Sequence, residues 1–211
     1  MSGRKGWASR QVAIWCVLAL AIVLPVATAA YSPLLAWRDP IYIIGGFAGV
    51  VALTLLLVQP MLASNMLPGL TKQRGRQIHK WTGALLVLLV ILHVGALWIT
   101  SPPDVVDALL FASPTPFSAW GVTAMWALFA AAFVAVFRRR FQLAVRVWRR
   151  IHTGLTSIVV LGSVIHAIRI DGTMETLSKT VLCGLVVIVA ARALKKSGAW
   201  KVWWPTKGRN G

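Results

Sequence analysis

Residues 149–169, RRIHTGLTSIVVLGSVIHAIR, form the segment that decides the fold. The segment is apolar between its ends and holds His152 and His166 fourteen positions apart. In an α-helix this spacing makes about 3.9 turns, so both imidazoles lie on one face, about 21 Å apart along the axis. The sequence therefore predicts one helix that presents histidines at two depths on the same side.

A second segment, residues 76–93, repeats this arrangement. Its sequence, RQIHKWTGALLVLLVILH, holds His79 and His93 at the same spacing, and an arginine again stands three residues before the first histidine. The two segments contain all four histidines of the chain. The repeat predicts two equivalent helices that carry matched pairs of histidines.

The composition places these helices in a membrane. Apolar residues make up 58% of the 211 residues, and six stretches are long and apolar enough to cross a bilayer core of about 30 Å as helices. We therefore expect an all-α membrane protein, a bundle of six transmembrane helices. The predicted spans are residues 11–30, 41–62, 79–99, 118–137, 152–168 and 177–194.

The charges sort between alternate loops. Nineteen of the 22 lysines and arginines fall before the first span, in the second and fourth loops, and after the sixth span, whereas all five acidic residues fall in the other three loops. The positive-inside rule therefore predicts that both termini are cytoplasmic. The net charge of +17 reflects this topology, and nucleic acid is not an expected partner because the basic residues do not gather with stacking aromatics. The compactness of the chain and its strong charge bias suggest a bacterial inner membrane.

The expected organisation is a single membrane domain with lipid around it. We expect residues 1–10 to form a cytoplasmic N-terminus, residues 11–194 a six-span membrane domain, and residues 195–211 a basic cytoplasmic tail. An A-x-A pattern at residues 25–32 leaves open whether the first span is cleaved as a signal peptide. Residues 138–148 mix basic and apolar side chains and are expected along the cytoplasmic interface.

Two matched histidine levels follow from this topology. The spans with histidines both run outward from the cytoplasm, so His79 can face His152 near the inner side and His93 can face His166 nearer the outside. Zinc is disfavoured because neither depth offers a thiolate or carboxylate. A porphyrin needs only two axial ligands, so two bis-histidine b-type haems account for all four side chains, and this ligation favours electron transfer over oxygen binding.

Small and basic residues near the histidines fit the same interpretation. Glycines and an alanine leave room for a flat macrocycle, although helix packing also selects such residues; they are Gly83, Ala84, Gly154 and Gly162. A Gly45/Gly49 GxxxG motif predicts close helix packing within the chain. The candidate partners for haem propionates are arginines near the histidines, namely Arg76, Arg149 and Arg150 at the inner level and Arg169 at the outer level.

By its six spans and its two H-x13-H pairs, the sequence resembles the ferric reductase-like transmembrane family, which includes iron reductases and the membrane part of the NADPH oxidases. The resemblance implies that His79 and His152 ligate an inner haem iron, and His93 and His166 an outer one. It also implies electron flow from a cytoplasmic reduced flavin to an extracytoplasmic acceptor. No glycine-rich dinucleotide fingerprint is present, so we expect the flavin to come through a separate partner such as a flavin reductase.

Three alternatives remain open from the sequence. The haem-binding membrane subunit of the periplasmic methionine sulfoxide reductase system is similar in length, but its inner position in the third span is often not histidine, whereas His79 is present here. A haem-free transporter can use histidines as a proton relay, which predicts buried acids that this chain lacks. In a structural subunit the histidines merely bond between helices.

Overall fold

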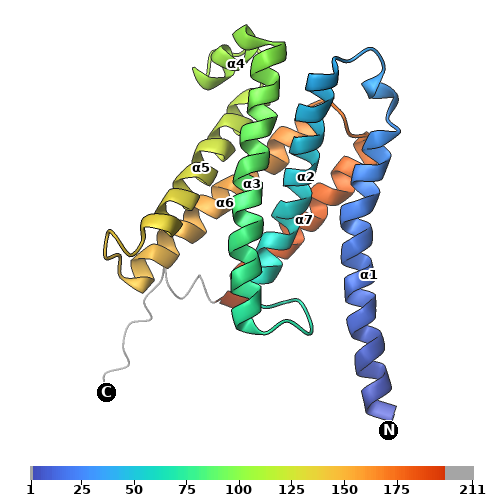
Figure 1. Cartoon of the computed structure of the whole chain (residues 1–211), viewed down its shortest axis with the longest axis vertical. Helices are drawn as coiled ribbons and strands as arrows, with labels where there is room; N and C mark the ends of the chain where they lie inside the picture. Colours follow the sequence, from blue (N-terminus) through green and yellow to red (C-terminus); the bar gives the residue numbers. More distant parts are fainter. Residues whose placement is uncertain (1, 198–211) are drawn as a thin grey trace, which may run out of the picture.

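The computed structural model describes residues 2–197, with side chains over residues 9–196, and it is helical without strands in that range (Figure 1). Six of its helices are long and apolar enough to cross a membrane, which confirms the six-span all-α fold. The long helices are α1 (Ser2–Ala30), α2 (Pro40–Ala63), α3 (Lys72–Thr100), α5 (Ser118–Phe137), α6 (Val145–Arg169) and α7 (Thr176–Ser197). Two short ones, η1 (Pro33–Leu35) and α4 (Pro102–Leu109), lie in connections. The end of the predicted tail, residues 198–211, lies outside the described residues.

The two helices with histidines extend further than the hydropathy pattern predicts. The predicted starts at residues 79 and 152 are too late, because α3 begins at Lys72 and α6 at Val145. These first turns are basic, and a helix of 29 residues is about 44 Å long, which exceeds the apolar thickness of a bilayer. Helical geometry therefore continues beyond the apolar run into the polar zone.

The segment expected along the interface, residues 138–148, is partly turn and partly helix. Residues 138–142 form turns, and from Val145 the chain already belongs to α6. The short helix α4 was not predicted. It begins with two prolines, which favour the first turn of a helix because their missing N–H groups need no partner there.

The bundle consists of two similar helical hairpins that both pack against α7. Helix α2 packs along α3, and α5 packs along α6. Helix α7 packs against both α2 and α6, while α1 lies at the periphery against α2 and α7 (Figure 1). The two helices with histidines, α3 and α6, have no extensive packing contact with each other. The hairpin α2–α3 thus corresponds to the hairpin α5–α6.

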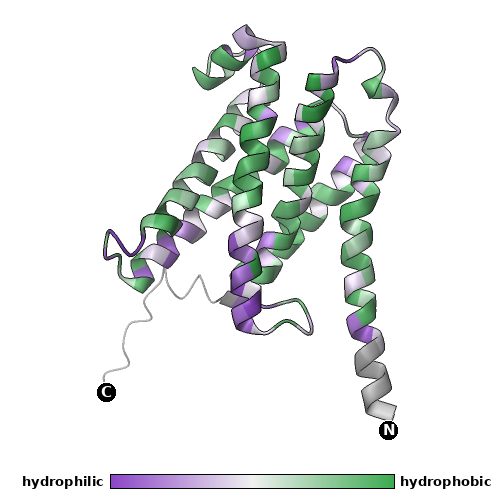
Figure 2. Ribbon diagram, viewed as in Figure 1, coloured by the Kyte–Doolittle hydropathy of each residue, from purple (hydrophilic) through white to green (hydrophobic). Residues whose placement is uncertain are grey.

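Polar residues gather at the ends of the bundle. The starts of α3 and α6 and the turn between α5 and α6 are hydrophilic at one end, whereas the helix surfaces between the ends are apolar (Figure 2). Large apolar side chains such as Val17, Leu20 and Leu88 are about 60% exposed, and lipid rather than water suits such surfaces. The chain is therefore an integral membrane protein.

Candidate functional site

The structure brings the four histidines together in the two predicted pairs. At the inner level the ring centroids of His79 and His152 lie 6.4 Å apart, with 76° between the ring planes. At the outer level the centroids of His93 and His166 lie 6.5 Å apart, with 80° between the planes. Because α3 and α6 do not pack directly, these imidazoles face each other across the space between the two hairpins.

Carbonyl groups of the neighbouring helices orient the rings. The Nδ1 atom of His93 lies 2.7 Å from the carbonyl oxygen of Gly45, and that of His79 lies 3.2 Å from the oxygen of Gln59, both on α2. The Nδ1 atom of His166 lies 2.9 Å from the carbonyl oxygen of Phe117 at the start of α5. A carbonyl can only accept, so each of these Nδ1 atoms donates and Nε2 is left as the nitrogen with a free lone pair.

The fourth histidine, His152, has an equivalent carbonyl nearby but lacks the corresponding hydrogen bond. The carbonyl of Ala131 on α5 is close enough to interact with His152, but Nδ1 of His152 is buried without a hydrogen bond of normal geometry within the described residues. The acceptor positions on α2 are fourteen residues apart, as are Phe117 and Ala131 on α5. Each helix with histidines therefore has a helix beside it that presents carbonyls at the same spacing.

Two glycines allow the outer histidine rings to lie close to the backbone of the neighbouring helices. A Cβ atom at Gly121 would lie 2.7 Å from Nδ1 of His166, and one at Gly49 would lie 3.1 Å from Nδ1 of His93. Gly45 serves helix packing as predicted, because its Cβ would lie 2.8 Å from Cβ of Ala96. The ring-supporting role of Gly49 and Gly121 was not predicted. Each glycine follows the residue that accepts the hydrogen bond by four positions, but only the structure identifies these acceptors.

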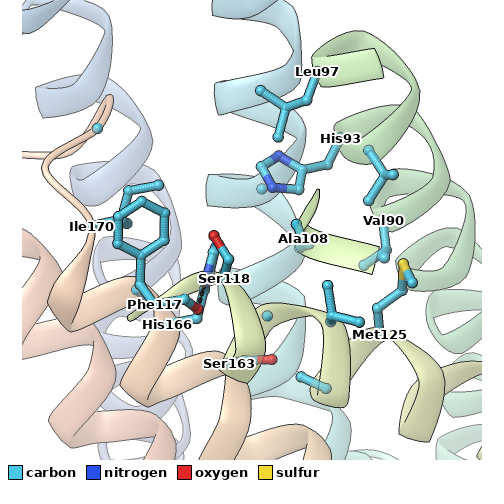
Figure 3. Close-up of a pocket in the computed structure, with 18 of the residues that line it drawn as sticks. Val90, His93, Leu97, Ala108, Phe117, Ser118, Met125, Ser163, His166 and Ile170 are labelled. Atoms are coloured by element: carbon cyan, nitrogen blue, oxygen red, sulfur yellow. Dashed lines mark hydrogen bonds between the residues drawn. The ribbon is translucent and has the colours of Figure 1, made fainter. Parts of the chain in front are cut away.

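A cavity of about 470 Å³ opens beside the outer pair. His93 projects into it from α3, and His166 lines it beside Phe117 and Ser118 (Figure 3). The volume lies within the range of pockets that hold cofactors and other small molecules. The outer level therefore has both a pair of imidazoles and space for a ligand.

Apolar side chains separate the two levels. Leu86 lies midway between the histidines of α3, and Val159 lies midway between those of α6; they are only 5% and 4% exposed. Leu56 of α2 and Leu128 of α5 are buried and line the same cavity. This layer offers no polar group that could pass a proton from one pair to the other.

The inner pair is covered by an aromatic side chain. Trp148 lies one turn before His152 and stacks on its ring, with centroids 5.6 Å apart and 19° between the planes. The guanidinium of Arg138 lies 4.5 Å from the centroid of the Trp148 ring, a cation–π arrangement. His152 is thus part of a stack of three side chains with Trp148 and Arg138.

The separation within each pair fits two imidazoles on opposite sides of one metal. A metal–imidazole bond is about 2.0–2.1 Å long and the ring centre lies about 1.2 Å beyond the nitrogen, so centroids about 6.5 Å apart are expected. Both observed separations match this value. The described residues contain no group of three His, Cys, Asp or Glu side chains that could hold a bare metal ion, so two histidines suit a metal whose other ligands come from a cofactor.

Arg169, the residue predicted as the propionate partner at the outer level, does not line the outer cavity. Arg76, Arg149, Arg150 and Arg169 are all exposed, and none of them lines the outer cavity. The cation that does line it is Lys179 of α7, which is 4% exposed and which the sequence analysis did not select. The signal for Lys179 was its position, a lysine close to an apolar span on the side where cations are scarce.

Two of the predicted small residues pack between helices. A Cβ at Gly162 would lie 2.9 Å from the carbonyl oxygen of Trp120 and 3.0 Å from Cβ of Ala124, so this glycine lets α6 approach α5. A Cβ at Gly83 would touch the side chain of Gln59 on α2. Neither residue lines the outer cavity, so their small size serves helix contacts.

Comparison with known proteins identifies the family. Residues 48–163, from the middle of α2 to near the end of α6, match the family described as ferric reductase like transmembrane component. The match includes His79, His93 and His152 and ends three residues before His166. No curated protein and no solved structure matches the chain. Because the match covers more than half of the chain and such domains generally bind haem, the protein belongs to the ferric reductase-like transmembrane family, whose domain is associated with electron transfer across membranes.

Proposed function

We propose that this protein is a two-haem b-type conduit that carries electrons from a cytoplasmic reduced flavin to an extracytoplasmic acceptor. In this proposal His79 and His152 would hold the inner haem iron, and His93 and His166 would hold the outer one. Haem, when bound, supplies a one-electron couple at each level. The observation that carries the proposal is the pair of facing imidazoles at each level, at a separation that fits a single metal between them.

The hydrogen bonds of the histidines support the assignment. Metal-binding histidines usually donate their other ring N–H to a carbonyl or carboxylate, which fixes the tautomer and the ring orientation. Gly45, Gln59 and Phe117 provide such carbonyls here. These three carbonyls leave Nε2 of His79, His93 and His166 free for a metal.

The apolar layer suits a path for electrons alone. A proton relay needs polar groups within hydrogen-bond distance of one another, whereas Leu86 and Val159 separate the levels with hydrocarbon. The proposal therefore accounts for electron transfer without an accompanying leak of protons.

The direction and location of transfer rest on the distribution of charge. Basic residues gather where α3 and α6 begin, on the side of the inner pair. By the positive-inside rule this side is cytoplasmic, which puts both termini in the cytoplasm and fits a bacterial inner membrane. The same basic surface suits a negatively charged donor, such as reduced flavin mononucleotide or a flavin reductase that carries it.

The first test is the haem content of purified protein. The chain is expressed with ample haem supply, and its pyridine haemochrome and dithionite-reduced spectra are measured against protein concentration. We expect a b-type spectrum and two haems per chain. A colourless preparation of folded protein would overturn the proposal.

Histidine variants then test the pairing. His79→Ala and His93→Ala should each retain one haem, the double variant His93→Ala/His166→Ala should still retain one, and His79→Ala/His93→Ala should retain none. Gly95→Ala is the matched control on α3, because a Cβ there meets nothing within 4 Å, and it should keep both haems. A double variant at one level that loses both haems would contradict the assignment of ligands.

Membrane vesicles test the direction. Reduced flavin added to inside-out vesicles should reduce the haems much faster than the same flavin added to right-side-out vesicles, because only the former expose the basic end. Equal rates in the two preparations would contradict a cytoplasmic donor site.

A further inference from the structure

Lys179 is a buried cation that the helix bundle itself does not neutralise. It lies in the first turn of α7 and is 4% exposed. Its Nζ atom donates a hydrogen bond to the carbonyl oxygen of Ile170 at 2.7 Å, and no carboxylate of the described residues pairs with it. An ammonium group has three N–H donors, so two remain for another acceptor.

The position is costly for a lysine. Burial removes the water that would solvate the charge, and a buried charge is normally paired. The partial positive charge at the N-terminus of α7 adds to this cost, since cations are favoured at the opposite end of a helix. A buried lysine here is best explained by an anion that the described structure does not contain.

The outer cavity is where this anion would lie. Lys179 lines the same cavity as His93 and His166, and among the described residues that line it no other is a lysine or an arginine. Asp104 also lines the cavity, but its side chain is exposed and does not pair with Lys179. The acidic residues nearest in sequence, Asp171 and Glu175, are exposed as well.

The loop before α7 packs closely against α2 beside the outer cavity. Thr173 is 7% exposed and lines the cavity, and its hydroxyl occupies the space that a Cβ at Gly46 would need. Gly46 therefore lets the loop of residues 170–175 lie against α2, where its Ile170 carbonyl fixes the Lys179 ammonium group. The lysine is held by its surroundings before any ligand binds.

We infer that Lys179 pairs with a carboxylate of the ligand in the outer cavity, namely a propionate of the outer haem. This inference rests on the proposed function and assigns to Lys179 the role that the sequence suggested for Arg169. It also assigns a function to α7, which lies outside the residues matched by the family.

A redox titration tests the inference. Removal of a positive charge beside the haem destabilises the reduced state, so Lys179→Met should lower the midpoint potential of the outer haem. At a fixed potential we expect at least a tenfold decrease in the ratio of reduced to oxidised outer haem, which corresponds to 59 mV for a one-electron couple. Lys179→Arg keeps the charge and should remain close to the wild type.

The titration is performed in the full chain and again in a His79→Ala background, which retains only the outer haem. Lys195→Met is the matched control, because Lys195 lies in the last turn of the same helix, is exposed and lies outside the cavity; it should leave the potential unchanged. Should Lys179→Met fail to fold, Lys179→Gln is compared with Lys179→Arg in the same way.

The outcomes separate the two proposals. A wild-type chain with fewer than two haems contradicts the proposed function. A wild-type chain with two haems whose outer potential is the same in the Met and Arg variants overturns only the role of Lys179. Equal shifts at both haems would also overturn it, because they would indicate a general loss of packing.

Discussion

At the outer level both imidazoles rest against glycines, Gly49 and Gly121, whereas the equivalent positions at the inner level are the alanines Ala63 and Ala135. The outer rings lie close to the backbone, with hydrogen bonds of 2.7 and 2.9 Å to carbonyls. At the inner level one hydrogen bond is longer, 3.2 Å, and Nδ1 of His152 has none.

At the inner level side chains support His152, whereas His79 keeps its hydrogen bond to the Gln59 carbonyl. Trp148 stacks on His152, and Arg138 lies over Trp148. Two levels with the same sequence spacing are therefore held in different ways. Carbonyls bind both outer rings, whereas an aromatic stack at the basic end supports one of the two inner rings. Backbone contacts tolerate no added atom, whereas a stack of side chains can rearrange.

The largest expected effect is that of Gly121→Ala. The new Cβ would lie 2.7 Å from Nδ1 of His166, and overpacking of this kind costs about 1–3 kcal/mol. The ring must move away from the Phe117 carbonyl, so we expect the outer haem affinity to fall about tenfold or more while the inner haem stays bound. Haem titration of the apoprotein, followed by absorbance, measures both affinities.

The inner equivalent provides the control for this comparison. Ala135→Gly removes a methyl group where the inner level already accepts one, so it should leave the haem content at two. If Gly121→Ala and Ala135→Gly weakened haem binding equally, the distinction between the two levels would be lost.

A smaller effect is expected from Trp148→Leu. The stack on His152 disappears, and aromatic pairs of this kind contribute about 0.5–1.5 kcal/mol. We expect the inner haem to bind several-fold more weakly and its low-spin electron paramagnetic resonance signal to shift, because the orientation of an axial imidazole changes. The signal of the outer haem should not move.

Trp126→Leu on α5 is the control for the stack, because Trp126 is 54% exposed and contacts Phe129 rather than a histidine. It should change neither signal. A Trp148 variant with an unchanged inner signal would show that the stack does not orient His152.

The smallest effect concerns the hydrogen bond between Gln59 and Thr82. The Gln59 amide donates to the Thr82 hydroxyl at 2.9 Å and joins α2 to α3 beside the inner pair. Double-mutant cycles in a membrane protein give an average of about 0.6 kcal/mol for such bonds. We expect a coupling energy of that size from Gln59→Leu, Thr82→Ala and the double variant in unfolding measurements.

Neither Gln59 nor Thr82 substitution should remove a haem, since the Gln59 carbonyl that accepts from His79 belongs to the backbone. Loss of the inner haem in Gln59→Leu would mean that the side chain, and not only the carbonyl, holds the inner level.

The sequence by itself determined the six spans and the pairing of the histidines. Long apolar runs predict transmembrane helices because each crosses a layer of fixed thickness, and a spacing of fourteen residues puts two side chains on one face of any helix. Both arguments depend on local geometry alone. For the same reason the helix ends were less well predicted, because α3 and α6 continue past the apolar run into basic sequence.

Only the tertiary structure decided what surrounds the imidazoles. The carbonyls of Gly45 and Phe117 come from helices more than forty residues away in sequence, and every residue carries a carbonyl, so no residue type marks them. Lys179 was overlooked because its sequence neighbours do not reveal that α7 packs against α2 and α6 beside the outer pair. Arg169 is close to His166 in sequence, but it is exposed and does not line the outer cavity. Which cation lies at the outer cavity therefore depends on long-range helix packing, which sequence periodicity does not reveal.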